Sequence, residues 1–573
     1  MGTTMSGAPE SFNASVYLVD RQVEAGHGDR IAVAGPAGTL TYAELAARAG
    51  EFASGLGAAG VRPEDRVFLV MSDRPETLVT ILAVMRMGAV AVPVSTMYNG
   101  AELDILLRDA RARVVVTTPE FETAVREALA HAPEAETLII AGDPPPRMED
   151  VTGVRVLPPE TEALIVADGL LTKAEDDTAL RALASEAEDG PDVRAWADVL
   201  AEGRLAGPAE PYETWADSPA LWLYTSGTTG TPKAAMHRHH GIKSVCETYG
   251  SQVLGIAADD RCFSVARLFF AYGMGNSMFF PLAAGATTIL DPARATPAGV
   301  AARLAEDRPT LFFAGPSFFA ALLAADAPAE AFTSVRLAVS AGEALPAEIH
   351  RRFTARYGVD IIDGLGSTEA LHIFISNRPG AVRPGTSGTV VPGYEARLLD
   401  EEGSPVKDDE PGNLYVRGDS IATGYWCRTA VTRQVFQGEW LRTGDTYTRS
   451  DDGFYTCLGR SNDMIKAGGI WVSPMEVEAR LLQHESVAEC AVVAYTDGDG
   501  LEKPVACVVP AAGRQVDTGE LIAFCRAELA PFKRPREVLV LDELPRTATG
   551  KVQRVVIRRI AADRLGNRER PVR

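Results

Sequence analysis

The sequence predicts an α/β protein with a large N-terminal domain of sheets and helices, a small antiparallel β subdomain, and a smaller α+β unit at the C-terminal end. Three observations predict this fold class. Up to about residue 363, apolar segments of strand length alternate with helical segments of about a dozen residues, as in largely parallel sheets. From about Gly380 to Cys457, short apolar segments are separated by Gly, Pro and Asp, which favours antiparallel strands. The 573 residues also exceed a single typical core, so two or more domains are expected.

The first helix is predicted from a capping box, Thr41-Tyr42-Ala43-Glu44, followed by Ala, Leu and Phe at helical spacing to about Leu56. Residues 143–215 interrupt the alternation with prolines at 144–146 and acidic, Ala-rich segments. We interpret 143–215 as a surface excursion that carries little chemistry. The other elements expected in this part are strands at 31–34, 67–71, 89–93 and 114–117, and helices at 76–87, 102–110, 173–187 and 192–200.

The alternation resumes at an apolar strand, 219–223, and continues into the β subdomain and the α+β unit. The Arg-rich tail, 558–573, is interpreted as a solvated end rather than a recognition element. Further strands are expected near Phe263 and at 310–314, 335–340, 360–363, 394–399, 412–417, 454–458, 487–494, 503–509 and 537–541. Further helices are expected at 240–254, 297–305, 317–324, 346–357, 476–483 and 518–529.

Composition argues against a nucleic-acid-binding, a secreted and a membrane-spanning protein. A formal net charge of −21 argues against a nucleic-acid partner, because a phosphate backbone needs a basic face. The seven cysteines are dispersed without a C-x-x-C pair, which predicts reduced thiols and a cytoplasmic location. Residues 1–13 lack the basic-then-apolar pattern of a signal peptide. The uncharged stretch 268–290 contains Asn276, Pro281 and several glycines, so we interpret it as a buried strand-loop-helix-strand passage and expect no membrane partner.

The most informative stretch is Tyr224-Thr225-Ser226-Gly227-Thr228-Thr229-Gly230-Thr231-Pro232-Lys233, which follows the strand at 219–223. Seven of its ten residues are Gly, Ser or Thr, and a Lys ends it. Such a loop directs backbone N–H groups, hydroxyls and one ammonium at a single point, which suits a polyphosphate. It is not a Walker A loop, because Pro232 separates the last Gly-Thr from Lys233 and Ala234 follows the Lys. The alternative is an ordinary polar surface turn.

The segment Thr225–Lys233 resembles the signature loop of the adenylate-forming superfamily, which includes acyl- and aryl-CoA ligases, peptide-synthetase adenylation domains and luciferases. Five further segments resemble that superfamily's motifs in the same order. They are Ser340–Ala344, Asp363–Glu369, Leu441–Asp445, Gly459–Lys466 with the following Gly468–Pro474, and Pro545–Lys551. The resemblance implies an N-terminal nucleotide- and acid-binding domain, 1–461, and a mobile C-terminal domain, 462–573, with the hinge at Asn462, where relatives commonly have Asp or Lys.

The resemblance also implies residue roles. Lys551 would carry the first half-reaction, Thr368 would contact the α-phosphate of ATP, and Glu369 would bind Mg²⁺. Asp445 would accept hydrogen bonds from the ribose hydroxyls, and Arg460 would contact the ribose or the phosphates. The remaining residues expected to bind ATP or coenzyme A are Thr225, Ser226, Gly227, Thr228, Thr229, Lys233, Gly342, Glu343, Ala344, Asp363, Gly364, Gly468, Gly469 and Trp471.

The acid is predicted from the stretch Arg267–Asn276 with Leu371–Asn377, which resembles benzoate-type aryl-CoA ligases. Its expected slot is flat and mostly apolar, as a planar ring requires. An amino-acid-activating domain would need a buried carboxylate for the α-ammonium, and no Asp or Glu occurs between Arg267 and Leu290. His372 could be a core histidine or could bond a ring hydroxyl, an amine or the carboxylate. The expected lining is Ala271, Tyr272, Gly364, Gly366, His372 and Ile373.

The predicted function is therefore ATP-dependent conversion of an aromatic carboxylic acid to its CoA thioester through an acyl-adenylate. The alternatives are a stand-alone enzyme that loads a carrier protein, a fatty acyl-CoA ligase, and a non-catalytic nucleotide-binding module. A homodimer is left open. The sequence His237-Arg238-His239-His240 lacks a clear third or fourth ligand, so a metal site there is not expected.

Overall fold

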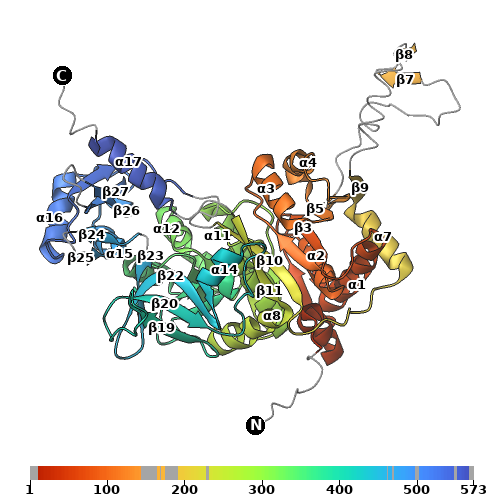
Figure 1. Cartoon of the computed structure of the whole chain (residues 1–573), viewed down its shortest axis with the longest axis horizontal. Coiled ribbons are helices and arrows are strands. Elements are labelled where there is room, and N and C mark those ends of the chain that lie inside the picture. The colour runs from red at the N-terminus through yellow and green to blue at the C-terminus, as the bar shows by residue number, and fades with distance from the viewer. Residues whose placement is uncertain are drawn as a thin grey trace, which may run out of the picture. The chain divides into compact units, whose positions relative to one another are not determined.

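The computed structural model describes residues 11–142, 164–167, 170–173, 191–226, 232–460, 463–467, 470–496, 502–546 and 552–566. The chain divides into two compact units (Figure 1). The first comprises Met1–Arg30 and Leu40–Ala234, and the second comprises Ile31–Thr39 and Ala235–Arg573. The predicted domain boundary at 461/462 lies within the second unit and stays a prediction.

The first unit is built on a sheet with the strand order β11-β10-β4-β3-β5-β6-β9. The pairs from β10 to β9 are parallel. Its central strands are almost wholly buried, and α2 is buried on nearly every side, which explains their continuous apolar sequences. The strands are β3 (Arg66–Val70), β4 (Val90–Pro93), β5 (Val114–Thr117), β6 (Thr137–Ile140), β9 (Asp192–Ala195), β10 (Pro219–Ser226) and β11 (Pro232–Arg238). The helices are α1 (Tyr42–Ala58), α2 (Pro75–Arg86), α3 (Gly100–Ala110), α4 (Glu122–Leu129) and α7 (Trp196–Ala206).

The predicted capping box of α1 is confirmed, since the Thr41 hydroxyl accepts from the Glu44 N–H and the Glu44 carboxylate accepts from the Thr41 N–H. The predicted helix at 192–200 is wrong in its first turn. Asp192–Ala195 forms β9, which pairs with β6, so strand pairing overrides local helix preference there. Within 143–215, β9 and α7 therefore belong to the fold of this unit, with Trp196, Val199 and Gly203 buried. In that region β7 (Leu164–Ala167) and β8 (Leu170–Lys173) form a hairpin, and the rest of the predicted helix at 173–187 lies outside the described residues.

The second unit contains a sheet in the order β18-β17-β16-β15-β14-β12-β13-β1. Its pairs are parallel from β1 (Ile31–Ala34) to β16, and antiparallel from β16 to β18. The other strands are β12 (Arg261–Ser264), β13 (Thr287–Ile289), β14 (Leu311–Ala314), β15 (Leu337–Ala341), β16 (Ile361–Gly366), β17 (Ile373–Ser376) and β18 (Thr389–Val390). The helices are α8 (His239–Val245), α9 (Ala271–Met274), α10 (Phe280–Ala284), α11 (Pro297–Asp307), α12 (Pro316–Ala324) and α13 (Ala347–Tyr357), with a π-helical continuation of α8 (Cys246–Val253) and a short 3-10 turn, η7 (Thr368–Ala370).

The predicted antiparallel β subdomain is confirmed as a sheet in the order β19-β20-β22-β21, with β23 on β22. A three-stranded sheet, β26-β27-β28, forms the centre of the C-terminal α+β region. The strands are β19 (Glu395–Leu399), β20 (Gly412–Arg417), β21 (Phe436–Gln437), β22 (Trp440–Arg449), β23 (Tyr455–Arg460), β24 (Ile465–Ala467), β25 (Ile470–Val472), β26 (Val487–Thr496), β27 (Glu502–Pro510) and β28 (Glu537–Val540). The helices are α14 (Thr429–Val435), α15 (Pro474–Leu481), α16 (Thr518–Glu528) and α17 (Arg554–Gly566).

The interpretation of 558–573 as a solvated end is wrong for its described part. Helix α17 continues to Gly566 and packs on β26 and β27 through Ile557, Ala561 and Leu565, which are buried (Figure 1). The arginines of this segment therefore alternate with core residues. Residues 567–573 lie outside the described residues.

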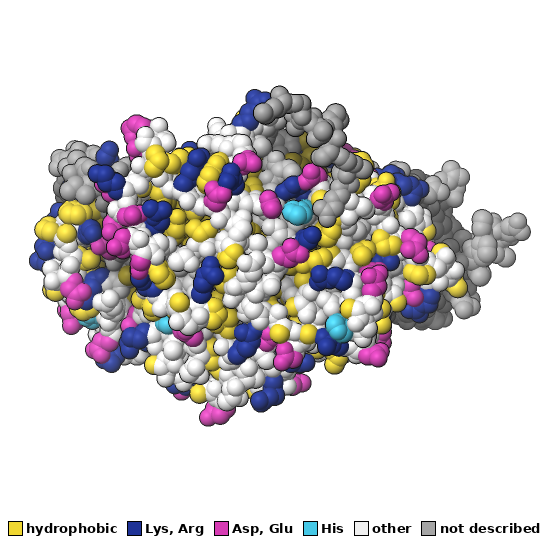
Figure 2. Space-filling view, turned by 90° about the horizontal axis from the view of Figure 1, so that it is seen from below, with side chains coloured by type: hydrophobic (Ala, Val, Ile, Leu, Met, Phe, Trp, Pro, Cys, Tyr) yellow, Lys and Arg dark blue, Asp and Glu magenta, His cyan; other side chains and the backbone are white. Residues whose placement is uncertain are grey.

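The described surface carries charges of both signs (Figure 2), and its helices are not of the membrane-spanning kind. On the face drawn in Figure 2, acidic and basic side chains are interspersed over the described surface. No helix among the described residues is both long enough and apolar enough to span a bilayer. The stretch 268–290 forms α9, a π-helical turn, α10 and β13, close to the predicted buried passage.

Candidate active site

Two neighbouring strands of the second unit bring predicted site residues to one sheet edge. Strands β15 and β16 are parallel, with Ser340 opposite Asp363 and Ala341 opposite Gly364. The segments that follow their carboxyl ends, Gly342–Ala344 and Ser367–Glu369, therefore begin at the same edge, where ligands bind in open α/β sheets. Gly342 adopts a positive φ of 96°, a conformation that favours glycine and turns the chain away from β15.

The Thr368-Glu369 pair lies on a turn whose carbonyl groups are all hydrogen-bonded. His237 Nε2 lies 2.9 Å from the Thr368 carbonyl oxygen. The Ala422 N–H donates to the Glu369 carbonyl at 2.8 Å, and the Ser420 hydroxyl donates to the Ala370 carbonyl at 2.7 Å. These contacts hold η7 from β11 and from the segment after β20, so the two side chains start from a fixed backbone.

The Glu369 carboxylate is oriented by a tyrosine. The Tyr425 hydroxyl donates to Glu369 Oε1 at 2.7 Å. Burial, reinforced by the adjacent carboxylate, raises the pKa of Tyr425, so the phenol stays protonated and remains a donor. Mg²⁺ in nucleotide sites is usually held by one or two carboxylates together with phosphate oxygens and water. A half-buried, oriented Glu369 fits that requirement without a further cluster of protein ligands, and no cluster of three or more His, Cys, Asp or Glu suited to a metal occurs in the described part of the chain.

Asp445 and Arg460 are opposite each other on β22 and β23. Arg460 Nε lies 3.1 Å from Asp445 Oδ1, and the Arg460 guanidinium also donates to the Thr443 carbonyl at 3.0 Å. The Asp445 carboxylate raises the pKa of Arg460, so the arginine keeps its charge. The structure thus joins two residues that the sequence predicted separately, and it provides a carboxylate with a fixed cation beside it.

Aromatic rings surround His372: one belongs to Tyr272, which was predicted to line the acid slot, and two belong to Tyr249 and Phe280, which sequence reasoning missed. The rings of Tyr249, Tyr272 and Phe280 have centroids 5.3, 5.6 and 4.6 Å from that of His372. The Tyr272 hydroxyl donates to the Val339 carbonyl of β15 at 2.9 Å, which ties α9 to the sheet edge. A β-carbon on Gly366 would lie 2.6 Å from the His372 carbonyl oxygen, so β16 approaches β17 too closely for a larger residue. Ala271 and Ile373 are buried in the same region, and a β-carbon on Gly364 would lie 2.8 Å from Ile373 Cγ2.

The His372 ring is neutral, and its Nδ1 can accept a hydrogen bond. Its Nε2 lies 3.3 Å from the Tyr272 carbonyl oxygen and 3.2 Å from Asn276 Oδ1. Because a carbonyl oxygen only accepts, Nε2 carries the hydrogen and Nδ1 carries a lone pair. Burial lowers the pKa of His372 to about 3, and Nδ1 has no hydrogen-bond partner within the described residues. This arrangement favours a ring hydroxyl or amine over a carboxylate as a partner for Nδ1.

Asp363 is the second buried titratable group at this edge. Burial raises its pKa to about 8, so its carboxyl is mainly protonated at neutral pH. The Asn377 N–H donates to the Asp363 carbonyl at 2.9 Å, which fixes the backbone where β16 reaches the site. A protonated, buried carboxyl differs from the exposed anion that a nucleotide-contacting Asp would present.

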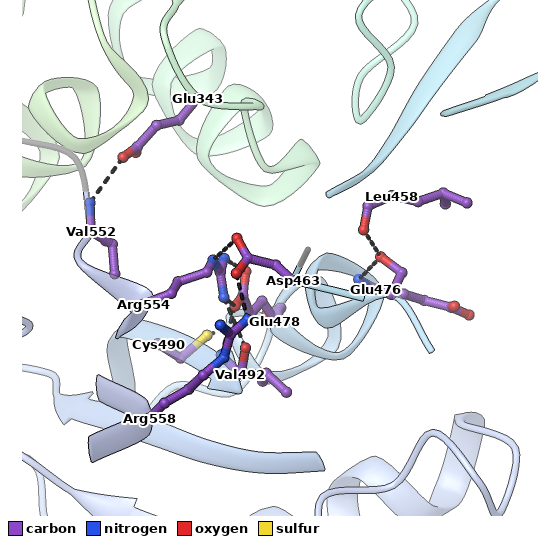
Figure 3. A network of polar contacts seen from close by, with 11 residues as sticks. Glu343, Leu458, Asp463, Glu476, Glu478, Cys490, Val492, Val552, Arg554 and Arg558 are labelled. Carbon is purple, nitrogen blue, oxygen red and sulfur yellow. Dashed lines mark hydrogen bonds and ion pairs between the residues drawn. The ribbon is translucent and has the colours of Figure 1, made fainter. Parts of the chain in front are cut away.

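The phosphate-loop residues belong to the first unit. Thr225 is half-buried near the end of β10, and Lys233 is buried at the start of β11. Ser226 ends β10 and Trp471 lies in β25, and the structure describes only the backbone of these two. Predicted residues that lie outside the described residues are Gly227, Thr228, Thr229, Asn462, Gly468, Gly469 and Lys551. The N–H of Val552, directly after Lys551, donates to Glu343 Oε1 at 3.3 Å (Figure 3).

Sequence reasoning missed His237 and Tyr425 as supports of the Thr368-Glu369 turn. The sequence indicates His237 only as part of the His237-Arg238-His239-His240 segment, where a metal site is not expected. In the structure its Nε2 faces the Thr368 carbonyl, whereas His240 lies 3.8 Å from Asp419. Burial lowers the pKa of His237 to about 4, so it is neutral. No spacing signal links Tyr425 to Glu369, because 56 residues separate them in the sequence.

Comparison with known proteins agrees with this geometry. Residues 19–426 match the family model of the AMP-binding enzyme, and residues 476–551 match that of the AMP-binding enzyme C-terminal domain. Benzoate–CoA ligase from Thauera aromatica is 39% identical over 557 residues, covering 96% of this chain and 96% of the relative.

Two solved structures are similar over nearly the whole chain. A benzoate CoA ligase from Burkholderia xenovorans is 39% identical, with a TM-score of 0.81 over 96% of this chain and 100% of that one. An anthranilate CoA ligase in complex with anthranoyl-AMP is 33% identical, with a TM-score of 0.83 over 98% of this chain and 99% of that one. These similarities confirm the predicted fold class.

Proposed function

The chain belongs to the AMP-binding enzyme family, and on that premise we propose that it is an ATP-dependent, AMP-forming aryl-CoA ligase of the benzoate type. The main support for an aromatic substrate is the cluster of Tyr249, Tyr272 and Phe280 around a neutral His372. This cluster adjoins the sheet edge that presents Thr368 and Glu369. Aromatic side chains with one unpaired polar atom among them suit a benzoate-type ring.

In the first half-reaction the acid's carboxylate attacks the α-phosphorus of ATP, forming the acyl-adenylate and releasing pyrophosphate. Both reactants are anions, so the barrier is mainly repulsion and alignment. Lys233 and the loop amides would hold the phosphates, Thr368 would contact the α-phosphate, and Lys551 would offset the charge that spreads over the carboxylate and α-phosphate. Glu369 would hold Mg²⁺, which neutralises charge on the departing pyrophosphate when it is bound.

The nucleoside would be held by groups whose orientation is already fixed. Asp445 would accept hydrogen bonds from the ribose hydroxyls, with its charge balanced by Arg460 at 3.1 Å. Gly342 and Ala344, which are small, would leave room for the adenine ring beside the end of β15. Preorganised groups of this kind need not rearrange when charge develops.

In the second half-reaction the thiol of coenzyme A attacks the adenylate carbonyl, and AMP leaves. We propose that the C-terminal domain rotates about Asn462 between the two steps, which withdraws Lys551 and presents Gly468, Gly469 and Trp471 to the pantetheine arm. Asn tolerates backbone conformations that most residues avoid, which is compatible with a hinge at this position. The proposal includes a cytoplasmic location, a small soluble acid as substrate, and no membrane or nucleic-acid partner, while a homodimer is left open.

The test is to incubate the purified protein with Mg²⁺, ATP and a panel of benzoate, hydroxy- and aminobenzoates, and medium-chain alkyl acids, with and without CoA. We expect AMP and an aryl-CoA thioester from one or more aryl acids, and little product from alkyl acids, because aromatic side chains around His372 suit a planar ring better than an alkyl chain. Product mass by chromatography and mass spectrometry identifies the thioester.

Three results would contradict the proposal. Thioesters formed only from alkyl acids would indicate a fatty acyl-CoA ligase. Aryl-adenylates formed without any CoA thioester would indicate an enzyme that loads a carrier protein. Nucleotide binding without pyrophosphate release for any acid would indicate a non-catalytic module.

A further inference from the structure

The C-terminal region contains a largely buried ionic cluster that the sequence analysis did not predict. Arg554, the first residue of α17, donates to Glu478 of α15 through both terminal nitrogens, at 2.6 and 2.9 Å (Figure 3). The same guanidinium donates to the Val492 carbonyl at 2.8 Å, and the Val492 N–H donates to Glu478 Oε1 at 2.6 Å. These four hydrogen bonds form a closed cycle, the Arg554 clamp, which joins α17, α15 and β26.

The Arg554 clamp is shielded from solvent. The side chains of Arg554 and Glu478 are 22% and 12% exposed. Burial opposes the charge on Arg554, but Glu478 more than offsets this effect and raises the pKa of the guanidinium. A buried ion pair is often no more stabilising than apolar side chains of equal volume, although it is costly to break. Its bidentate geometry does, however, fix the orientation of both partners.

The backbone next to the clamp leads directly to Lys551. Arg554 follows Lys551 by three residues. The described residues on the two sides of 547–551 are paired, because Arg546 and Val552 form an antiparallel bridge and the Gln553 N–H donates to the Pro545 carbonyl at 2.8 Å. On the earlier side, Arg546 pairs with Glu489 of β26 at 2.7 Å. Both sides of the Lys551 segment are therefore anchored to β26, one by Glu489 and the other by the clamp.

A second arginine of α17 extends the cluster toward the predicted hinge. Arg558 pairs with Asp463 at 2.5 Å, and Arg554 Nε lies 4.0 Å from the same carboxylate (Figure 3). Asp463 directly follows Asn462 in the sequence. Helix α17 thus holds the residue after the hinge, and its first residue holds the segment after Lys551.

We propose that Arg554, held by Glu478 and Val492, is a positioning residue for Lys551 in the adenylation half-reaction. This inference rests on the proposed function, in which Lys551 acts in the first half-reaction and not in the second. A lysine has a long, flexible side chain, so the rate it confers depends on how closely its backbone is held. Loosening the first turn of α17 would spread Lys551 over more positions while leaving its charge unchanged.

The test compares Arg554→Gln with wild type in the two half-reactions separately. We expect ATP–pyrophosphate exchange with an aryl acid to fall at least tenfold in kcat, with a smaller change in KM for ATP. Thioester formation from a supplied aryl-adenylate and CoA should change less than threefold, because Lys551 is withdrawn in that step. The double variant Lys551→Ala with Arg554→Gln should be no slower in adenylation than Lys551→Ala alone. Arg554→Lys, which keeps the charge but not the bidentate contact, should recover part of the lost rate.

Arg480→Gln is the matched control for a purely structural effect. Arg480 lies in α15, and like Arg554 it is largely buried, with a side chain 10% exposed. It pairs with Glu528 at 3.0 Å and donates to the Phe524 carbonyl. Its loss should lower thermal stability without separating the two half-reactions. Should Arg554→Gln fail to fold, Glu478→Gln provides the same comparison, because the amide oxygen can still accept from the Val492 N–H.

Two outcomes would overturn the inference. One is an equal loss of rate in both half-reactions. The other is a double variant whose adenylation rate falls below that of Lys551→Ala by the same factor by which Arg554→Gln falls below wild type. Either would show that Arg554 acts independently of Lys551. If Lys551→Ala itself leaves adenylation intact, the proposed role of Lys551 fails, and the positioning role fails with it. The Lys551→Ala measurement therefore distinguishes failure of the proposed function from failure of this inference alone.

Discussion

Burial determines the chemistry of the histidines around the Thr368-Glu369 edge. The pKa values of His237 and His239 are lowered to about 4 and that of His372 to about 3, in each case mainly by burial. At neutral pH these rings are therefore uncharged supports and acceptors. For His372 this means that Nδ1 can accept a hydrogen bond, whereas the neutral ring cannot offset the charge of a carboxylate.

The lowered pKa of His372 predicts an acid-sensitive stability. The unfolded chain binds a proton near pH 6.5 and the folded chain only near pH 3, so stability is fully present above pH 6.5 and is lost as the pH falls toward 3. One such group lowers the free energy of unfolding by about 2 kcal/mol at pH 5, relative to pH values above 6.5. We expect the melting temperature to drop less between pH 7.5 and pH 5.0 in His372→Gln than in wild type. Thermal denaturation at both pH values checks this, and an equal drop in the two proteins would contradict it.

The supports of individual site residues could not be predicted from the sequence. The motif Asp363–Glu369 predicts Thr368 and Glu369 where a strand ends, and the structure agrees, because η7 directly follows β16. Asp445 lies in the middle of β22, and Arg460 ends β23. The contacts from His237 to Thr368 and from Tyr425 to Glu369 span 131 and 56 residues. Periodicity and capping patterns report only on neighbours within a few residues, so these contacts depend on tertiary structure.

At the scale of elements, segments with strong hydrophobic periodicity were predictable from the sequence. A strand that forms only because it pairs with the edge of a sheet was not. The capping box of α1 and the buried valines of β5 are local signals, and both elements formed as predicted. The sequence Asp192–Ala195 has no strand signal of its own and becomes β9 because β6 offers a free edge. The helix then begins at Trp196, whose ring stacks on Phe52 of α1 with centroids 4.7 Å apart.

Helices α1 and α7 cross at glycines, which predicts a steric requirement. A β-carbon on Gly203 of α7 would lie 1.8 Å from the Glu51 carbonyl oxygen, so the helices would have to separate. We expect Gly203→Ala to lower the free energy of unfolding by about 1–3 kcal/mol, as overpacked sites do. The control is Gly57→Ala on α1, where a β-carbon meets nothing within 4 Å and a gain of about 0.5–1 kcal/mol is expected. Thermal or urea denaturation compares them, and a neutral Gly203→Ala would show that α7 is not held against α1.

At the scale of the whole molecule, the predicted site residues come from distant parts of the chain. Thr225 and Lys233 belong to the first unit, and Thr368, Asp445 and Arg460 belong to the second, so a common site for all five stays a prediction. Ion pairs also bracket the predicted hinge, since Arg460 pairs with Asp445 before it and Asp463 pairs with Arg558 after it. The order of the motifs predicts a common site, whereas the pairing on either side of Asn462 required the structure.

The two-step use of Lys551 is the property of the whole molecule that is most directly testable. Its ammonium is needed only while charge spreads between the carboxylate and the α-phosphate, so Lys551→Ala should slow adenylation by about a hundredfold to a thousandfold. The same variant should convert a supplied aryl-adenylate and CoA to thioester at close to the wild-type rate. Pyrophosphate exchange and thioester formation measure the two steps, with Lys533→Ala as a control, because Lys533 pairs with Glu476 in the same region. Equal loss in both steps would mean that Lys551 stays in place throughout the reaction and that the domain does not rotate between the half-reactions.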